Sequence, residues 1–244
     1  MDIGAHPHMG LQTVSYLMDG EILHHDSLGC EALARPGTVN VMTSGAGIAH
    51  AEESPVDHSG RLHGVQLWVA LPDSRRHGAA DFQHVEETPV LELPGGNVRV
   101  FGGAMLNAVS KARHYSELLG ADVSIEPGAA FELPLDPRFE HGVLVLEGNV
   151  AADGAALSGD ALYAAAPGRG SIELRSDSGA RVLLLGGLPF EERILMWWNF
   201  VARDMGEIRA AREAWETGDR FGHIRGFRGP RIAAPPVAPS VLRD

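Results

Sequence analysis

Two pairs of potential metal ligands lie near the start of this 244-residue sequence. One residue separates His6 from His8, and one residue separates His50 from Glu52. In an extended strand, residues i and i+2 point to the same face, so each pair can direct two side chains at one point. Imidazole and carboxylate ligands suit iron, zinc, manganese, nickel or copper. If the two strands face each other, the four side chains form a metal site.

The overall composition limits the choice of partners. The chain has 20 basic and 32 acidic residues and a formal net charge of −12, whereas nucleic-acid binding requires a dense basic surface. The charge also argues against anionic membranes, but it leaves a small substrate or a protein partner open. A single cysteine, Cys30, fits a reducing compartment. Because we find no secretory pattern and no apolar run long enough to span a bilayer, we expect a cytoplasmic protein.

Frequent turns divide the chain into short extended segments. Thirty glycines and fifteen prolines separate runs of strand length, a pattern typical of a β-sandwich or barrel rather than of βαβ units. The predicted strands include residues 13–17, 38–42, 64–70, 98–101, 142–146 and 181–185. In both halves a β run meets an acidic-glycine turn, and a proline–glycine turn follows. This shared outline predicts a duplicated β-barrel, with the joint near residues 107–116.

One helix is predicted near the C-terminus. Asp204 suits the N-cap and Glu207 the N3 position of a capping box. Apolar residues follow at spacings of three and four, and Gly218 marks the expected end. The preceding segment, 194–201, is interpreted as a strand and core seam that joins the tail to the barrel. From Gly229 onward, through Pro239, we expect an extended or disordered arm.

Several motifs together resemble the pirin family, which belongs to the cupin superfamily. They are His-Pro-His-Met-Gly at residues 6–10, the stretch 20–29, Arg-Pro-Gly at 35–37, the Gly-x-Gly-Ile-x-His-x-Glu pattern that ends at Glu52, the run 64–69, and two tail motifs at 186–190 and 196–200. The resemblance implies an all-β bicupin. Residues 1–110 would form a metal-binding cupin domain. Residues 111–244 would form a cupin domain without metal, carrying the short helix and the extended tail.

The resemblance also implies a ligand set and a chemistry. His6, His8, His50 and Glu52 would hold one Fe(II) or Fe(III) ion per chain, with other divalent metals as substitutes. Some pirin-like proteins are similar to quercetin 2,3-dioxygenases, which cleave a flavonol ring with O₂. The implied partners are therefore a flavonol-like substrate and O₂, and Glu52 would be both a ligand and the base nearest the substrate hydroxyl. His25 and Asp26 would orient the ligands or form a polar turn.

The resemblance leaves other readings open. Other pirin-like proteins resemble non-enzymatic, metal-dependent or redox-sensing regulators that bind a transcription factor or a metabolic enzyme. The net charge suits a protein partner of this kind. A third reading is a metal-binding fold whose activity on flavonols is incidental. Related chains also carry strands ahead of the His-Pro-His segment. Either the start codon is assigned too late, or the chain is shortened, or the first barrel is incomplete. An incomplete barrel would have an unpaired sheet edge and a more open pocket.

Overall fold

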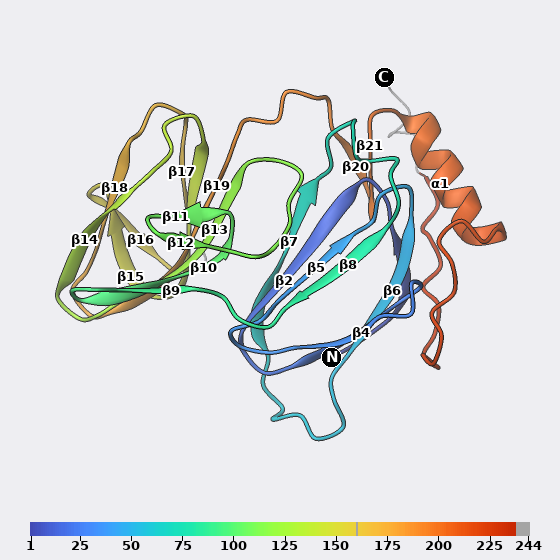
Figure 1. Cartoon of the computed structure of the whole chain (residues 1–244), viewed down its shortest axis with the longest axis horizontal. Coiled ribbons are helices and arrows are strands. Elements are labelled where there is room, and N and C mark those ends of the chain that lie inside the picture. Colours follow the sequence, from blue (N-terminus) through green and yellow to red (C-terminus); the bar gives the residue numbers. More distant parts are fainter. Residues whose placement is uncertain (160, 238–244) are drawn as a thin grey trace. The chain divides into compact units, whose positions relative to one another are not determined.

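The computed structural model describes residues 1–159 and 161–237, which form two compact units built almost entirely of strands (Figure 1). Residues 1–86 and the segment from Glu192 onward make up the first unit, and residues 87–191 make up the second. The all-β prediction is confirmed. No helix in the described residues combines the length and the apolar character that a membrane crossing requires.

The first unit contains two four-stranded antiparallel sheets, ordered β1-β6-β3-β4 and β7-β2-β5-β8. Side chains from the two sheets meet, because Trp68 of β7 packs against His8 of β1 and Phe82 of β8 stacks on His24 of β3. The elements are β1 (Asp2–His8), β2 (Leu11–Asp19), β3 (Ile22–Asp26), β4 (Glu31–Ala34), β5 (Val39–Thr43), β6 (Ile48–Glu53), β7 (His63–Ala70), β8 (Asp81–Val85), β20 (Leu195–Trp197), β21 (Phe200–Ala202) and α1 (Met205–Thr217).

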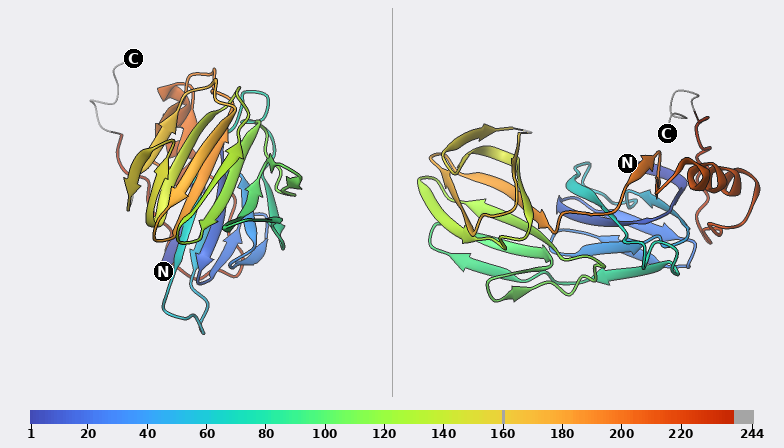
Figure 2. Two further views of the ribbon diagram at one scale, coloured as in Figure 1. Left: turned by 90° about the vertical axis from the view of Figure 1, so that its left-hand side faces the viewer. Right: turned by 90° about the horizontal axis from the view of Figure 1, so that it is seen from above.

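The second unit is dominated by one curved sheet, green to orange in Figure 2, in which β14, β18, β15, β19, β13, β10 and β9 follow one another. Its core is aliphatic, with residues such as Val98, Val123 and Leu184 fully buried. The elements are β9 (Val90–Leu93), β10 (Gly96–Gly102), β11 (Ala104–Met105), β12 (Ala108–Val109), β13 (Leu118–Ile125), β14 (Ala129–Pro134), β15 (Glu140–Ala152), β16 (Ala155–Ser158), β17 (Leu162–Ala165), β18 (Ser171–Ser176) and β19 (Ala180–Gly187).

The two units divide the chain differently from the expected domains 1–110 and 111–244. Residues 87–110 belong to the second unit because β10 pairs with β13 along its length. The C-terminal segment belongs to the first unit because its apolar residues pack there. Phe200, Trp215 and Phe221 share one buried cluster with Met9 and Ala49. The prediction of a core seam in the segment 194–201 is confirmed for Phe200, which is fully buried in this cluster. Met9 and Ala49 are the sequence neighbours of His8 and His50, so the cluster lies next to the candidate ligands.

Helix α1 begins as the sequence predicts. The Asp204 side chain accepts a hydrogen bond from the Glu207 backbone N–H at 3.0 Å, so Asp204 is the N-cap. The reciprocal bond of a capping box is absent among these residues, because the Glu207 carboxylate accepts from the Arg203 backbone N–H instead. Gly218 follows the last helical residue, as expected, and its N–H bonds to the Ala214 carbonyl.

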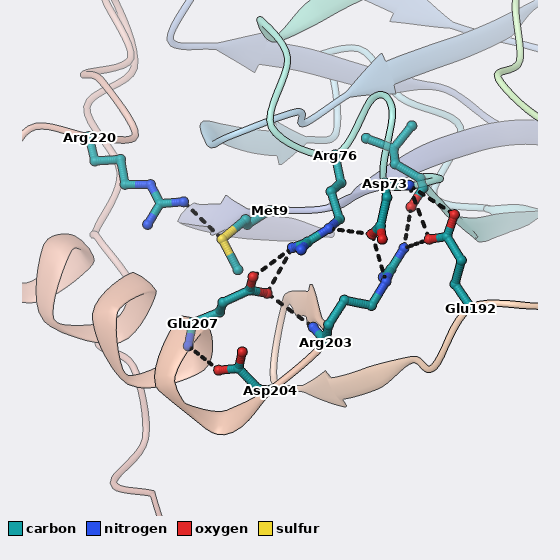
Figure 3. Close-up of polar contacts among 9 residues, drawn as sticks. Met9, Asp73, Arg76, Glu192, Arg203, Asp204, Glu207 and Arg220 are labelled. Carbon is teal, nitrogen blue, oxygen red and sulfur yellow. Dashed lines mark hydrogen bonds and ion pairs between the residues drawn. The ribbon is translucent and has the colours of Figure 1, made fainter.

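A half-buried charge network fixes the start of this helix (Figure 3). Arg76, in the loop after β7, donates to Asp73 at 2.7 Å and to the Glu207 carboxylate at 2.8 Å. Arg203 pairs with Asp73 at 3.0 Å and also with Glu192. The two guanidinium groups are 12 and 13% exposed, so solvent screens these pairs less than it screens ordinary surface pairs. The network ties the loop after β7 to the base of α1.

The C-terminal arm lies along part of the outer edge of β1. Ala5 donates to the Pro230 carbonyl and accepts from the Ile232 N–H, both at 2.8 Å. The Trp215 indole N–H donates to the Ile232 carbonyl at 2.8 Å and anchors the arm to α1. At Ala5 the edge of β1 is therefore paired, in contrast to the open edge expected there. Within the described part of the arm, Arg231 forms a parallel β-bridge with Ala5, and the predicted continuation through Pro239 lies outside the described residues.

Candidate metal centre

Three neighbouring strands bring the candidate ligands to one face of their sheet. In the antiparallel pair β1 and β6, His6 lies directly opposite His50. On the other side of β6, β3 places His24 directly opposite Glu52. Because alternate residues of a strand share a face, His8 joins His6 and both residues of the β6 pair point inward together. The two residues of each i, i+2 pair therefore share one face of the sheet.

His6, His8 and His50 form a buried cluster of three imidazoles. One potential ligand atom from each lies within 4.8 Å of the other two. The ring centroids are 4.2 Å apart for His6 and His50, and 4.9 Å apart for His8 and His50. At most 8% of any of the three residues is exposed. Three converging imidazoles of this kind are a donor set for a transition metal.

Glu52 belongs to a second group that overlaps the first. Ligand atoms of His24, His50 and Glu52 also lie within 4.8 Å of one another. His50 is thus shared by both groups, and the four predicted ligands fall into two overlapping sets rather than one. Gln66, from the opposite sheet, donates from Nε2 to Glu52 Oε1 at 2.8 Å and holds that carboxylate in place.

Burial keeps the imidazoles neutral. Desolvation, reinforced by the nearby His6, lowers the pKa of His8 well below its ordinary value. The same two causes, with further contributions from His8 and His24, lower the pKa of His50 well below its ordinary value. Neutral rings carry a lone pair on one nitrogen, which is the form that binds a metal.

Several buried ring nitrogens in this cluster have no hydrogen-bond partner within the described residues. They are Nε2 of His50 and the ring nitrogens of His8, although the backbone of Asn199 lies close enough to His8 to oppose the lowering of its pKa. Buried polar atoms are nearly always satisfied, so unpartnered atoms that converge on one point indicate a group that binds there. The third ring is already oriented, because His6 Nδ1 lies 2.8 Å from the Gly4 carbonyl, to which it donates. Its Nε2 is left with the lone pair, and the residues therefore fit a metal ion.

Glu52 is a buried acid with an adjoining cavity. Desolvation raises its pKa to about 7, against the opposing effect of the Gln66 hydrogen bond. A cavity of about 190 Å³ reaches this side chain, and its wall includes Ser15, Leu17 and Val65. The mainly apolar wall, which also includes Glu52, suits a small apolar molecule that carries a hydroxyl group.

His24 is the residue that the sequence analysis did not single out. Its ring lies 5.3 Å from His50 and stacks on Phe82, with centroids 4.4 Å apart. Its two neighbours, for which the sequence suggested one shared role, have different contacts. Asp26 contacts His24, whereas His25 points away and contacts Glu53. His24 and Asp26 are themselves an i, i+2 pair on β3. The rule that identified the other two pairs could therefore have found this one.

The second unit contains a buried histidine with a different character. His141 is 5% exposed and packs beside Phe139 and Gly186. It alternates with Val143 and Val145 on the inward face of β15. Both groups of three potential ligands found in the described residues lie in the first unit.

The chain folds into curved antiparallel sheets, and the first unit carries an inward-facing cluster of histidines. Both features are typical of a cupin-type protein with two barrels. The family model named Pirin matches residues 1–69, and the model for the Pirin C-terminal cupin domain matches residues 120–222. The chain belongs to the pirin family, and the predicted all-β bicupin class is confirmed.

Known relatives extend over nearly the whole chain. A Pseudomonas aeruginosa protein, provisionally named a quercetin 2,3-dioxygenase, is 46% identical over 236 residues, or 96% of this chain and 75% of that protein. Human pirin is 31% identical over 218 residues, covering 84% of this chain and 73% of its own. The crystal structure of a quercetin 2,3-dioxygenase from Acinetobacter baumannii matches with a TM-score of 0.94 and 40% identity, over 98% of this chain and 80% of that one.

Proposed function

We propose that this protein is an iron-dependent dioxygenase of the quercetin 2,3-dioxygenase type, with a flavonol-like substrate. The observation that carries the proposal is the convergence of buried, unpartnered imidazole nitrogens from His8 and His50, beside the oriented ring of His6. The relatives with 46 and 40% identity whose names refer to this activity support the choice of reaction.

His6, His8, His50 and Glu52 would hold the metal. When bound, iron would supply the Lewis-acid and redox chemistry that lets a flavonol react with O₂. The protein would contribute an enclosed site: Trp68 packs edge-on against His8, with ring centroids 5.1 Å apart. This side chain covers the imidazole from the opposite sheet and limits the access of water.

Glu52 would also handle the substrate proton. Gln66 occupies Oε1 through its hydrogen bond, so Oε2 is the oxygen able to accept a proton from a substrate hydroxyl. The raised pKa of Glu52 belongs to the metal-free chain. A bound cation would favour the ionised carboxylate, which is the form that accepts a proton from a substrate hydroxyl. The cavity that reaches Glu52 has an apolar wall against which an aromatic ring can lie.

Turnover by the iron-loaded full chain tests this proposal. We expect loss of quercetin absorbance with matching O₂ consumption, and near-complete loss of both in the Glu52→Gln variant. Glu53→Gln is the matched control, because Glu53 adjoins Glu52 but points to the other face and contacts His25. If the iron-loaded protein neither consumes O₂ nor alters the flavonol, the enzymatic proposal fails and the regulator reading is favoured.

The ligand assignment has a separate test. Metal analysis after iron loading should give about one iron per chain, with near-complete loss in His8→Ala and in Glu52→Ala. His25→Ala is the matched control, since His25 is buried in the same sheet but contacts Glu53 and Glu31 rather than the cluster. Retention of iron by both cluster variants would refute the assignment.

A further inference from the structure

Asp26 is a buried carboxylate held by the backbone at the end of β3. Its Oδ1 accepts hydrogen bonds from the N–H groups of Leu28 and Cys30, at 2.9 and 3.0 Å. The side chain is fully buried. These two bonds fix the carboxylate, so that its other oxygen, Oδ2, faces Nε2 of His24 at 3.2 Å.

The direction of each hydrogen bond follows from the chemistry of the groups. An ionised carboxylate can only accept, so the proton between Asp26 and His24 belongs to His24 Nε2. When the His24 ring donates from Nε2 to Asp26 and carries no second proton, its lone pair lies on Nδ1. That atom faces His50 Nδ1 at 3.5 Å, which is longer than an ordinary N–H hydrogen bond, and a proton on His50 Nδ1 avoids the repulsion between two lone pairs. The lone pair of His50 then falls on Nε2.

The arrangement is built into the strands. Antiparallel pairing sets Asp26 opposite His50 and His24 opposite Glu52. Phe82 stacks on the His24 ring at an interplanar angle of 12° and holds it from the opposite sheet. The freed atom, His50 Nε2, is one of the buried nitrogens without a partner in the described residues.

We propose that Asp26 and His24 form a positioning relay, which fixes the tautomer and ring orientation of His50 so that Nε2 is presented to the metal. In this arrangement His24 is a positioning residue and not a ligand, although it lies near His50 and Glu52. The role of Nε2 toward a metal rests on the proposed function. The tautomer itself is a property of the protein alone.

The relay can be read directly in the uniformly ¹⁵N-labelled, metal-free full chain. Two-bond ¹H–¹⁵N correlation spectra distinguish the two neutral histidine tautomers. In the wild type we expect His50 to be protonated on Nδ1. In Asp26→Asn the side-chain amide would donate to His24 Nε2, which places the proton of His24 on Nδ1. His24 Nδ1 would then donate to His50 Nδ1, and the proton of His50 would move to Nε2. Asp19→Asn is the matched control, because Asp19 pairs with Arg61 at the surface.

The proposal is overturned if wild-type His50 carries its proton on Nε2, or if Asp26→Asn leaves the tautomer unchanged. Because no metal or substrate is present, neither result depends on turnover. A protein with the predicted tautomer and no activity toward quercetin would contradict the proposed function while leaving the relay intact.

Cobalt(II) binding separates a positioning role from a ligand role. Outer partners of metal ligands typically change affinity by about 10- to 100-fold, so we expect losses of this size in Asp26→Asn and in His24→Phe. The ligand-field absorption bands should keep the wild-type pattern in both variants. If His24→Phe instead shifts those bands to a lower coordination number, His24 is a ligand and the positioning role is wrong. Far-ultraviolet circular dichroism checks that each variant is folded. If one variant does not fold, the other still tests the expected loss of cobalt affinity.

Discussion

The burial of Glu52 has a measurable consequence for the stability of the metal-free protein. Its pKa rises from an ordinary value of 4.5 to about 7 in the folded chain. The folded state therefore binds this proton more tightly than the unfolded state does. The resulting stabilisation is fully present below pH 4.5 and is lost as the pH rises through about 7. Each tenfold change in proton affinity is worth about 1.4 kcal/mol, so the total loss is about 3 kcal/mol.

Glu52→Gln removes the titration while keeping an oxygen for the Gln66 hydrogen bond. We expect the free energy of unfolding of the chelator-treated wild type to fall, relative to this variant, by roughly 2.5 kcal/mol between about pH 5 and pH 8. His8 and His50 have lowered pKa values in the folded chain, so their contribution to the free energy of unfolding rises with pH, opposite to that of Glu52. They are present in both proteins, so their contribution largely cancels in the difference.

Urea unfolding at the two pH values measures this difference. Glu53→Gln serves as the control for removing a neighbouring carboxylate, and its pH dependence should follow that of the wild type. Parallel pH dependences for the wild type and Glu52→Gln would refute the reasoning, because they would mean that Glu52 ionises as readily in the folded protein as in the unfolded chain.

Three further substitutions test the packing around the site, each by chemical unfolding. Gly10→Ala should cost more than about 1 kcal/mol, because Gly10 has φ +75° and an added Cβ would lie 2.0 Å from the Val201 carbonyl oxygen. Phe200→Ala should cost about 3–5 kcal/mol, since Phe200 is fully buried in the cluster that supports the ligand strands. Trp215→Phe should cost about 1 kcal/mol by removing the bond to Ile232, and it should speed proteolysis of the C-terminal arm.

The i, i+2 rule predicted the local geometry of the site because it depends on strand structure alone. His6 and His8 share a face, as do His50 and Glu52, and the antiparallel register sets His6 against His50. The rule could not say which pairs face each other, since register depends on contacts far apart in sequence. For the same reason it did not bring His24 into the cluster.

The place of the C-terminal segment was the least predictable part of the fold. Its helix, N-cap and apolar stripe follow local rules, and all three are present. Its partners, Met9 and Ala49, lie within the first 50 residues of the chain, and no local pattern encodes so distant a contact. The segment was therefore expected with the second domain, whereas it packs behind the strands that carry His8 and His50.

X-ray diffraction at the iron absorption edge would locate the metal most directly. In crystals of the iron-loaded chain, we predict one anomalous peak per chain, in contact with Nε2 of His6 and Nε2 of His50, and with His8 and Glu52 completing the set. A peak at any other position, or no peak at this cluster in protein that carries iron, would contradict the assignment of the metal centre.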